Sequence, residues 1–172
     1  ALDAGLEPVK INAVMMRGIN DDEIVEFAEY GRTKGVTIRF IEFMPLEAGD
    51  VWNDHLVVPA EEVMKNIAAA FPIEPVLRGS DPAERWRYSD GKGEVGVIGS
   101  VTKPFCENCD RVRLTAEGQF RTCLFAVDEF DMRSLLRSQA NDEAIADAIS
   151  AAVGTKWSGH SIGQVNFIRP KR

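Results

Sequence analysis

The fold is decided by the stretch PVKINAVMMRGINDDEIVEFAEYGRTKGVTIRFIEF, which occupies residues 8–43. Residues 8–16 are mostly apolar and include Val and Ile, as is typical of a strand buried on both faces. Asp21 and Asp22 then start a helix whose apolar side chains recur at helical spacing up to Gly35. Residues 36–43 form a second β-rich run. We therefore predict a β-α-β unit with parallel strands and a right-handed crossover.

The remainder of the chain predicts a helix, short strands and further helix. A polar stretch after Met44 and Pro45 breaks the pattern, so we expect a domain boundary near residue 50. A proline and two acidic residues over 59–62 open a helix that runs to about residue 71. Turn residues separate five β-rich runs and predict antiparallel hairpins over 73–78, 86–89, 95–101, 111–115 and 119–125. From Asp131 on, the apolar spacing is helical again.

The sequence GKGEVG at residues 91–96 matches the GxGxxG pattern of dinucleotide-binding proteins. That motif needs a strand before it and a helix after it, so that the pyrophosphate meets the helix N-terminus. Here the glycines lead into VGVIGSV, which is typical of a strand. We therefore predict a hairpin turn at these residues.

The composition is that of an ordinary globular protein. The 172 residues are 45% hydrophobic and 27% charged, with a net charge of −7, which argues against a general nucleic-acid binder. No apolar run reaches membrane-spanning length, and the chain, which begins at Ala1 as if within a domain, carries no secretory signal. Three cysteines fit a disulfide framework poorly. We expect a soluble protein of the reducing cytoplasm that binds neither nucleic acid nor membranes.

All three cysteines lie in KPFCENCDRVRLTAEGQFRTCLF, residues 103–125. The predicted hairpin around residues 116–118 folds Cys123 back towards Cys106 and Cys109. A CxxC pair serves as a redox dithiol, as half of a zinc site or as ligands to an iron–sulfur cluster. A redox CxxC normally opens a helix, whereas a strand is predicted here, which disfavours that reading.

Two metal sites are compatible with this spacing. A structural zinc site needs a fourth ligand, which His55 or His160 would supply. A four-iron cluster held by three thiolates leaves one iron open to take a substrate atom. The spacing alone does not decide between zinc and a cluster, and inert or redox thiols are the third alternative.

Cations in two places suggest an anionic ligand. Arg111 and Arg113 point to one face of a strand, and their forks match phosphate groups and guanine edges, although a solvated strand face is the alternative. Lys10 and Arg39 lie inside apolar runs, where a cation is costly unless it is paired or lines a cavity such as a barrel mouth. An edge strand, or an ion pair with Glu42, would explain these two residues equally well.

Four segments together point to a known family. In chain order they are PVKINAVMMRGINDDEI, TIRFIEFMPL, KPFCENCDRVRLTAEGQFRTCLF and KWSGHSI. They resemble the C-terminal half of the MoaA family, the radical SAM enzymes with GTP 3',8-cyclase activity in molybdenum-cofactor biosynthesis. The resemblance covers nearly the whole chain, and it favours a cluster over zinc.

The resemblance implies an α/β fold in which residues 1–50 are the last β/α units of an incomplete TIM-like radical SAM barrel. Residues 51–172 would be an α+β domain that carries the second iron–sulfur cluster. In this family a first [4Fe-4S] cluster on a CxxxCxxC motif cleaves S-adenosylmethionine to a radical. That radical takes a hydrogen from C3' of GTP, and the substrate radical then attacks C8 of the guanine.

Matching motifs imply a role for particular residues of this chain. The second [4Fe-4S] cluster would be held by Cys106, Cys109 and Cys123. GTP would be contacted by Lys10, Arg111, Val112 and Arg113. S-adenosylmethionine would be contacted by Met44, with Arg39 nearby. The family further implies a homodimer and a downstream cyclic pyranopterin monophosphate synthase as partners.

Two features depart from the family pattern. The sequence contains no CxxxCxxC motif, and it ends in IRPKR where the family usually ends in Gly-Gly. We therefore expect the whole protein to be the cyclase, and these residues alone to be inactive, with an incomplete GTP pocket and no catalytic residue of their own. The alternative is a zinc-stabilised domain with a structural or binding role and no chemistry.

Overall fold

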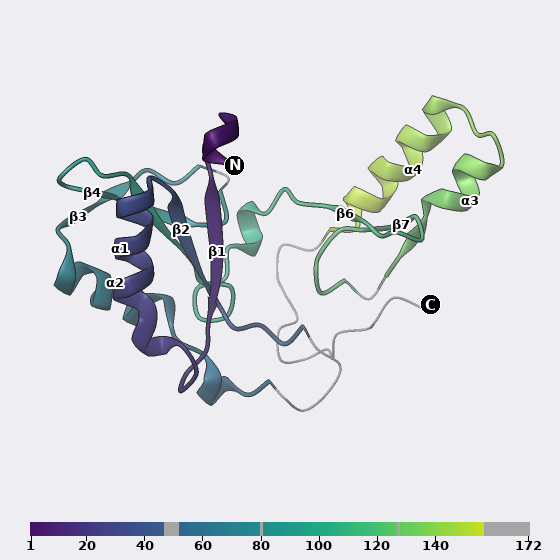
Figure 1. The fold of residues 1–172 in the computed structure, drawn as a ribbon. Helices are drawn as coiled ribbons and strands as arrows, with labels where there is room; N and C mark the ends of the chain where they lie inside the picture. The colour runs from purple at the N-terminus through teal and green to yellow at the C-terminus, as the bar shows by residue number, and fades with distance from the viewer. Residues whose placement is uncertain (47–51, 80, 127, 157–172) are drawn as a thin grey trace. The chain divides into compact units, whose positions relative to one another are not determined.

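The computed structural model describes residues 1–46, 52–79, 81–126 and 128–156. These residues form two compact units (Figure 1). The first contains residues 1–45 and 52–105, and the second contains Leu46 and the described residues from Cys106 on.

A mixed five-stranded sheet forms the centre of the first unit, with the strand order β1-β2-β5-β4-β3. Its strands are β1 (Lys10–Met15), β2 (Thr37–Glu42), β3 (Ile73–Val76), β4 (Glu84–Tyr88) and β5 (Glu94–Ile98). β1, β2 and β5 are parallel, whereas β5, β4 and β3 pair in the antiparallel direction. The predicted parallel β-α-β unit and the predicted hairpins of this region are therefore confirmed.

Two helices, α1 (Ile24–Lys34) and α2 (Ala60–Ala70), pack on one face of this sheet. The alternation of side chains along β1 and β2 places Met15 and Phe40 on that face, where both are fully buried. α1 approaches β2 so closely that a Cβ on Gly31 would lie 2.8 Å from Ile38 Cγ1. Only glycine fits there without a shift. The result is a continuous hydrophobic core between the helices and the sheet.

Residues 91–93 lie in the turn between β4 and β5, as predicted, and residues 94–96 begin β5. Gly91 and Gly93 adopt φ angles of 78° and 94°, which favour glycine. The backbone N–H of Tyr88 donates to the carbonyl of Gly93 at 3.1 Å and closes the hairpin. A strand rather than a helix follows the glycines, so the geometry of a dinucleotide fingerprint is absent from these residues.

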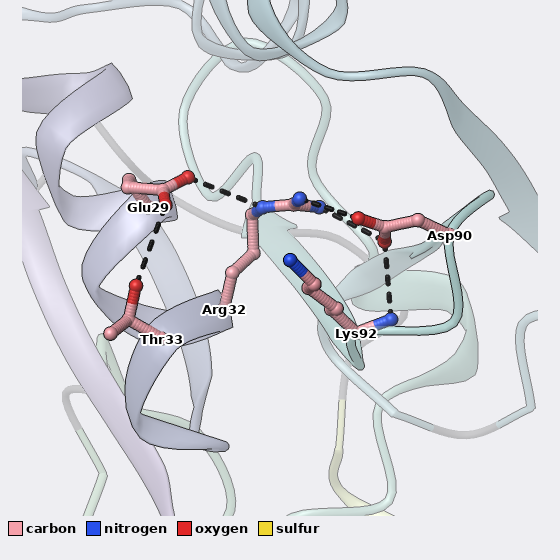
Figure 2. A network of polar contacts seen from close by, with 5 residues as sticks. All are labelled: Glu29, Arg32, Thr33, Asp90 and Lys92. Atoms are coloured by element: carbon pink, nitrogen blue, oxygen red, sulfur yellow. Dashed lines mark hydrogen bonds and ion pairs between the residues drawn. The ribbon is translucent and has the colours of Figure 1, made fainter.

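Arg32 of α1 fixes this hairpin turn (Figure 2). Its guanidinium group donates to the carboxylate of Asp90 at 2.6 Å and to Glu29 at 3.3 Å. The same group lies 4.5 Å from the ring centroids of both Phe71 and Tyr88. Ionic and cation–π contacts therefore hold the turn against the helix.

The second unit contains a small antiparallel sheet and two helices. The strands β6 (Arg113–Leu114), β7 (Gln119–Arg121) and β8 (Phe130–Asp131) lie in that order, and α3 (Met132–Arg137) and α4 (Asp142–Gly154) follow. The predicted hairpin is confirmed, although its strands are shorter than predicted. Gly118 in its turn has a φ of 80°, and a Cβ there would lie 2.6 Å from the Cβ of Arg133. Among the described residues of this unit, Phe120, Met132 and Ala152 form a buried core with two partly buried neighbours.

The two units change over at Cys106 rather than near residue 50. The reason is that β5 pairs with β2, so that residues well beyond 50 complete the first sheet. The assignment of residues 1–50 to a barrel and of residues 51–172 to a cluster-binding domain stays a prediction. In the part of the chain that the structure describes, no helix is both long enough and apolar enough to span a membrane.

Candidate functional site

The three cysteines lie together in the second unit. Cys106 begins a 3-10 turn, Cys106–Asn108, and the N–H of Cys109 donates to the carbonyl of Cys106 at 3.2 Å. Cys123 comes shortly after β7. Because β6 and β7 pair antiparallel, the segment leaving Cys109 runs beside the segment entering Cys123. All three are free thiols and partly buried.

Arg111 contacts the thiol of Cys109 directly. Its Nε and Nη2 both lie 3.4 Å from the Cys109 Sγ. Burial raises the pKa of Cys109, but hydrogen bonds from the backbone and side chain of Arg111, with the charges of Arg111 and Lys156, outweigh burial and hold that pKa below its ordinary value. The thiolate form of Cys109, which is the form that binds metals, is thus favoured.

The pKa of Cys106 is shifted in the opposite direction, above its ordinary value. Burial raises its pKa first, and the neighbouring Cys123 and Cys109 raise it further. The effect of those two thiols on Cys106 supports the expectation that the hairpin brings Cys123 close to the CxxC pair. Three adjacent thiolates repel one another, so a cation or a metal group is needed to hold all of them ionised.

Lys156, just beyond α4, supplies a cation that the sequence reasoning missed. Its Nζ donates to the carbonyls of Arg111 at 2.6 Å and Thr122 at 2.7 Å, and lies 3.9 Å from the Sγ of Cys109. The residue is the first of the KWSGHSI segment, but nothing in its local sequence indicates that it contacts the cysteines.

Two further arginines face each other across β6 and β7. Arg113 pairs in register with Arg121. Burial, followed by the charge of Arg111, lowers the pKa of Arg113, and no carboxylate of the described residues lies within ion-pair distance of it. Arg121 is buried and is held by Glu129 at 3.2 Å and by the carbonyl of Ala126 at 2.7 Å. The half-buried Arg113 is therefore available to an anion, while Arg121 is occupied within the protein.

The three thiols bear on the choice between the two kinds of metal site that the spacing allows. Among the described residues, no group of three or more His, Cys, Asp or Glu side chains is close enough together to hold a single metal ion. In an iron–sulfur cluster each thiolate binds a different iron, so the sulfur atoms need not converge on one point. Three partly buried thiols beside two cations fit such a cluster. His160 lies outside the described residues, and His55 belongs to the first unit, where its side chain is 92% exposed.

Three other predicted site residues, Lys10, Arg39 and Met44, lie in the first unit. Lys10 and Arg39 share the face of β1 and β2 that α1 and α2 do not cover. The Lys10 Nζ is 3.9 Å from the Oδ2 of Asp81, and the Arg39 Nε donates to the Oδ1 of Asn12 at 2.9 Å. Met44 is partly buried, two residues beyond the end of β2. Val112, in the second unit, is 44% exposed.

Glu42 is not the ion-pair partner that was considered for these cations, and that alternative is wrong. It points to the opposite face of β2 and is 2% exposed. Its carboxylate accepts hydrogen bonds from the backbone N–H groups of Ala60, Val101 and Thr102 at 2.7 to 2.8 Å, and from the Thr102 hydroxyl. Glu42 therefore fastens the start of α2 and the segment after β5 to the end of β2.

Comparison with known proteins assigns the family. Residues 36–162 match the family described as Molybdenum Cofactor Synthesis C. The chain belongs to this family. It is 45% identical over its full length to a GTP 3',8-cyclase of Streptomyces coelicolor, and it covers 51% of that protein.

Other similar proteins give the same picture. Over 94% of the chain, it is 44% identical to a GTP 3',8-cyclase of Acidothermus cellulolyticus, of which it covers 45%. Over 98% of the chain, it is 42% identical to the GTP 3',8-cyclase 2 of Mycobacterium tuberculosis, of which it covers 49%. The chain thus spans about half the length of the curated relatives that it matches.

Proposed function

We propose that this chain is the C-terminal part of a GTP 3',8-cyclase, in which Cys106, Cys109 and Cys123 hold a [4Fe-4S] cluster that binds GTP. The observation that carries the proposal is the contact of Arg111 with the Cys109 thiol, in a chain that is 42 to 45% identical to enzymes named GTP 3',8-cyclase. A cation beside a thiolate offsets the negative charge that a thiolate-bound cluster adds.

The side chains around the cysteines would each contact a different part of the GTP molecule. When bound, the cluster would offer one iron without a protein thiolate, and that iron can accept an atom of the guanine ring. Arg113, half-buried and without a carboxylate partner among the described residues, is suited to an anionic or carbonyl oxygen of GTP. Val112 offers an apolar surface between the two arginines. Arg111 would serve both the cluster and the nucleotide.

The first unit would contribute to the same reaction. Lys10 and Arg39 are cations on one face of a sheet, and their only partners among the described residues are Asp81 and Asn12. We assign Lys10 to the phosphates of GTP, and Met44 with Arg39 to S-adenosylmethionine. In this proposal the parallel strands β1 and β2 are the last strands of an incomplete TIM-like barrel.

The remaining chemistry belongs to the whole protein. A first [4Fe-4S] cluster and S-adenosylmethionine would generate the radical outside these residues, so the 172 residues alone would not turn over GTP. The product would pass to cyclic pyranopterin monophosphate synthase, and the enzyme would act as a homodimer in the reducing cytoplasm.

The test is metal analysis and GTP binding on the full-length protein, purified without oxygen. We expect iron and acid-labile sulfide, and weaker GTP binding when Arg111 and Arg113 are both replaced by Ala. The exposed Arg137→Ala on α3 is the matched control and should bind GTP normally. One tightly held zinc in a colourless protein, or unchanged GTP affinity in the double variant, would contradict the proposal.

A further inference from the structure

We propose that Lys156 is a positioning residue that holds the two cysteine-bearing segments of the second unit in place for the metal group. The lysine bridge, meaning Lys156 Nζ with the carbonyls of Arg111 and Thr122, is a contact in the protein itself. The nature of the metal group it serves rests on the proposed function. Neither the family assignment nor the relatives' names assign a role to this lysine.

The position of the two carbonyls carries the argument. Arg111 lies two residues after Cys109, and Thr122 immediately precedes Cys123. The pairing of β6 with β7 ends at Arg113 and Arg121, on the side of the hairpin where the cysteines lie. The lysine bridge therefore begins where the β-ladder stops, and it joins the two segments that carry the thiols.

The hydrogen-bonding capacity of an ammonium group matches this site. Lys156 has three donors and no acceptor. Two donors reach the carbonyls at 2.6 and 2.7 Å, and the Sγ of Cys109 lies 3.9 Å away, at the outer limit for sulfur. Thr122 is buried, so its carbonyl would be costly to leave without a partner.

A lysine near the end of a helix often serves only to cap that helix, but Lys156 does not. Capping lysines bond to the last carbonyls of their own helix. The end of α4 is instead closed by the Thr155 hydroxyl, which donates to the Ala152 carbonyl at 2.7 Å, and by the Lys156 backbone N–H, which donates to Val153 at 2.9 Å. The side chain of Lys156 is thereby left to bridge the cysteine segments.

α4 is a firm support for the bridge. Ala152, one turn before Lys156, is fully buried and packs in the core with Phe120 of β7. The lysine therefore extends from a helix that is itself packed on the hairpin. Such outer-shell contacts pre-organise metal ligands, and their loss typically lowers metal affinity about 10- to 100-fold.

The test compares three substitutions in the full-length protein. Lys156→Met removes the charge and all donors, Lys156→Arg keeps both, and Thr155→Val removes the hydroxyl cap of α4 but leaves the bridge. After anaerobic reconstitution, we expect Lys156→Met to release the iron of this site to a chelator about 10- to 100-fold faster. Thr155→Val should behave as wild type, and Lys156→Arg should recover most of the retention.

A second readout needs no metal. In the metal-free protein, amide hydrogen exchange over residues 109–113 and 121–124 should be faster in Lys156→Met than in wild type, and unchanged in Thr155→Val. If Lys156→Met does not fold, Lys156→Gln, which is neutral but keeps one polar amide, takes its place with the same expectations. Wild-type iron retention together with wild-type exchange in the neutral variant would overturn the proposal. A wild-type protein without iron would instead contradict the proposed function, and hydrogen exchange would then decide the lysine bridge alone.

Discussion

The two units are stabilised in different ways. In the first, a sheet and two helices enclose a continuous apolar core that includes Met15, Phe40 and Ile67. In the second, the described residues form a core with three buried side chains, and their strands are two or three residues long. Polar contacts of Arg111, Arg121 and Lys156 link the segments around the cysteines. Burial of apolar side chains therefore dominates the first unit, whereas in the described part of the second unit polar contacts around the cysteines add to a small apolar core.

The largest expected effect comes from Phe40→Ala in the core of the first unit. Phe40 is fully buried, so its truncation should cost about 3 to 5 kcal/mol of unfolding free energy. The loss is measured by denaturant unfolding, with hydrogen exchange used to monitor each unit separately. Leu77→Ala, at a 93% exposed position, is the control. Phe120→Ala should cost less in the second unit, and an equal cost would break the comparison.

Glu42→Gln tests the hydrogen bonds that the buried Glu42 carboxylate accepts from backbone N–H groups of the first unit. The amide nitrogen of Gln would face N–H groups that now donate to a carboxylate, so we expect a loss of about 2 to 3 kcal/mol. Thermal unfolding measures it. Glu61→Gln is a matched change at an exposed position of α2 and should cost under about 1 kcal/mol. Similar values for the two variants would remove the anchoring role of Glu42.

Arg32→Met should have a smaller effect, of about 1 kcal/mol from its aromatic contacts. The contribution of its ion pair depends on pH, because hydrogen bonding to Arg32 holds the pKa of Asp90 below its ordinary value. That contribution is fully present above the ordinary aspartate pKa, and is lost as the pH falls through the lowered pKa of the folded protein. Unfolding at several acidic pH values should show a weaker pH dependence in Arg32→Met than in wild type. An identical profile would contradict the pairing.

The smallest expected effect is a difference in reactivity between two thiols of the second unit. In the metal-free protein at mildly alkaline pH, Cys109 should be alkylated faster than Cys106, because its pKa is lowered whereas that of Cys106 is raised. Peptide mass spectrometry after iodoacetamide treatment measures the ratio, which should fall towards equality in Arg111→Ala. Faster reaction of Cys106 in the wild type would show that Arg111 does not control the thiols.

Much of the first unit could be predicted because its pattern is local. Two apolar runs around an amphipathic helix specify a parallel β-α-β unit, and the glycines at 91 and 93 specify a hairpin. The placement of β5 between β2 and β4 could not be predicted, since periodicity does not encode which strands pair. The buried position of Glu42 was missed for a similar reason, because its partners lie in segments that only the fold brings near.

Part of the candidate site could likewise be predicted from the sequence, and part could not. The cysteine spacing and the two following arginines are readable from a short stretch, and the contact of Arg111 with Cys109 is a two-residue interaction. Lys156 was not found, since a lone lysine beyond a helix has no local signal, and α4 carries it to the hairpin only in the folded unit. The short strands of that unit also limited the accuracy of its predicted boundaries.

In the proposed function, the three thiols hold an iron–sulfur cluster that binds GTP. The most direct measurement is the iron content and GTP affinity of the anaerobically reconstituted full-length protein, compared with its C106A/C109A/C123A variant. We predict that the variant loses about four irons per chain, as for one [4Fe-4S] cluster, and binds GTP more weakly. An unchanged iron content, or the loss of a single zinc with unchanged GTP affinity, would show that these thiols do not hold such a cluster.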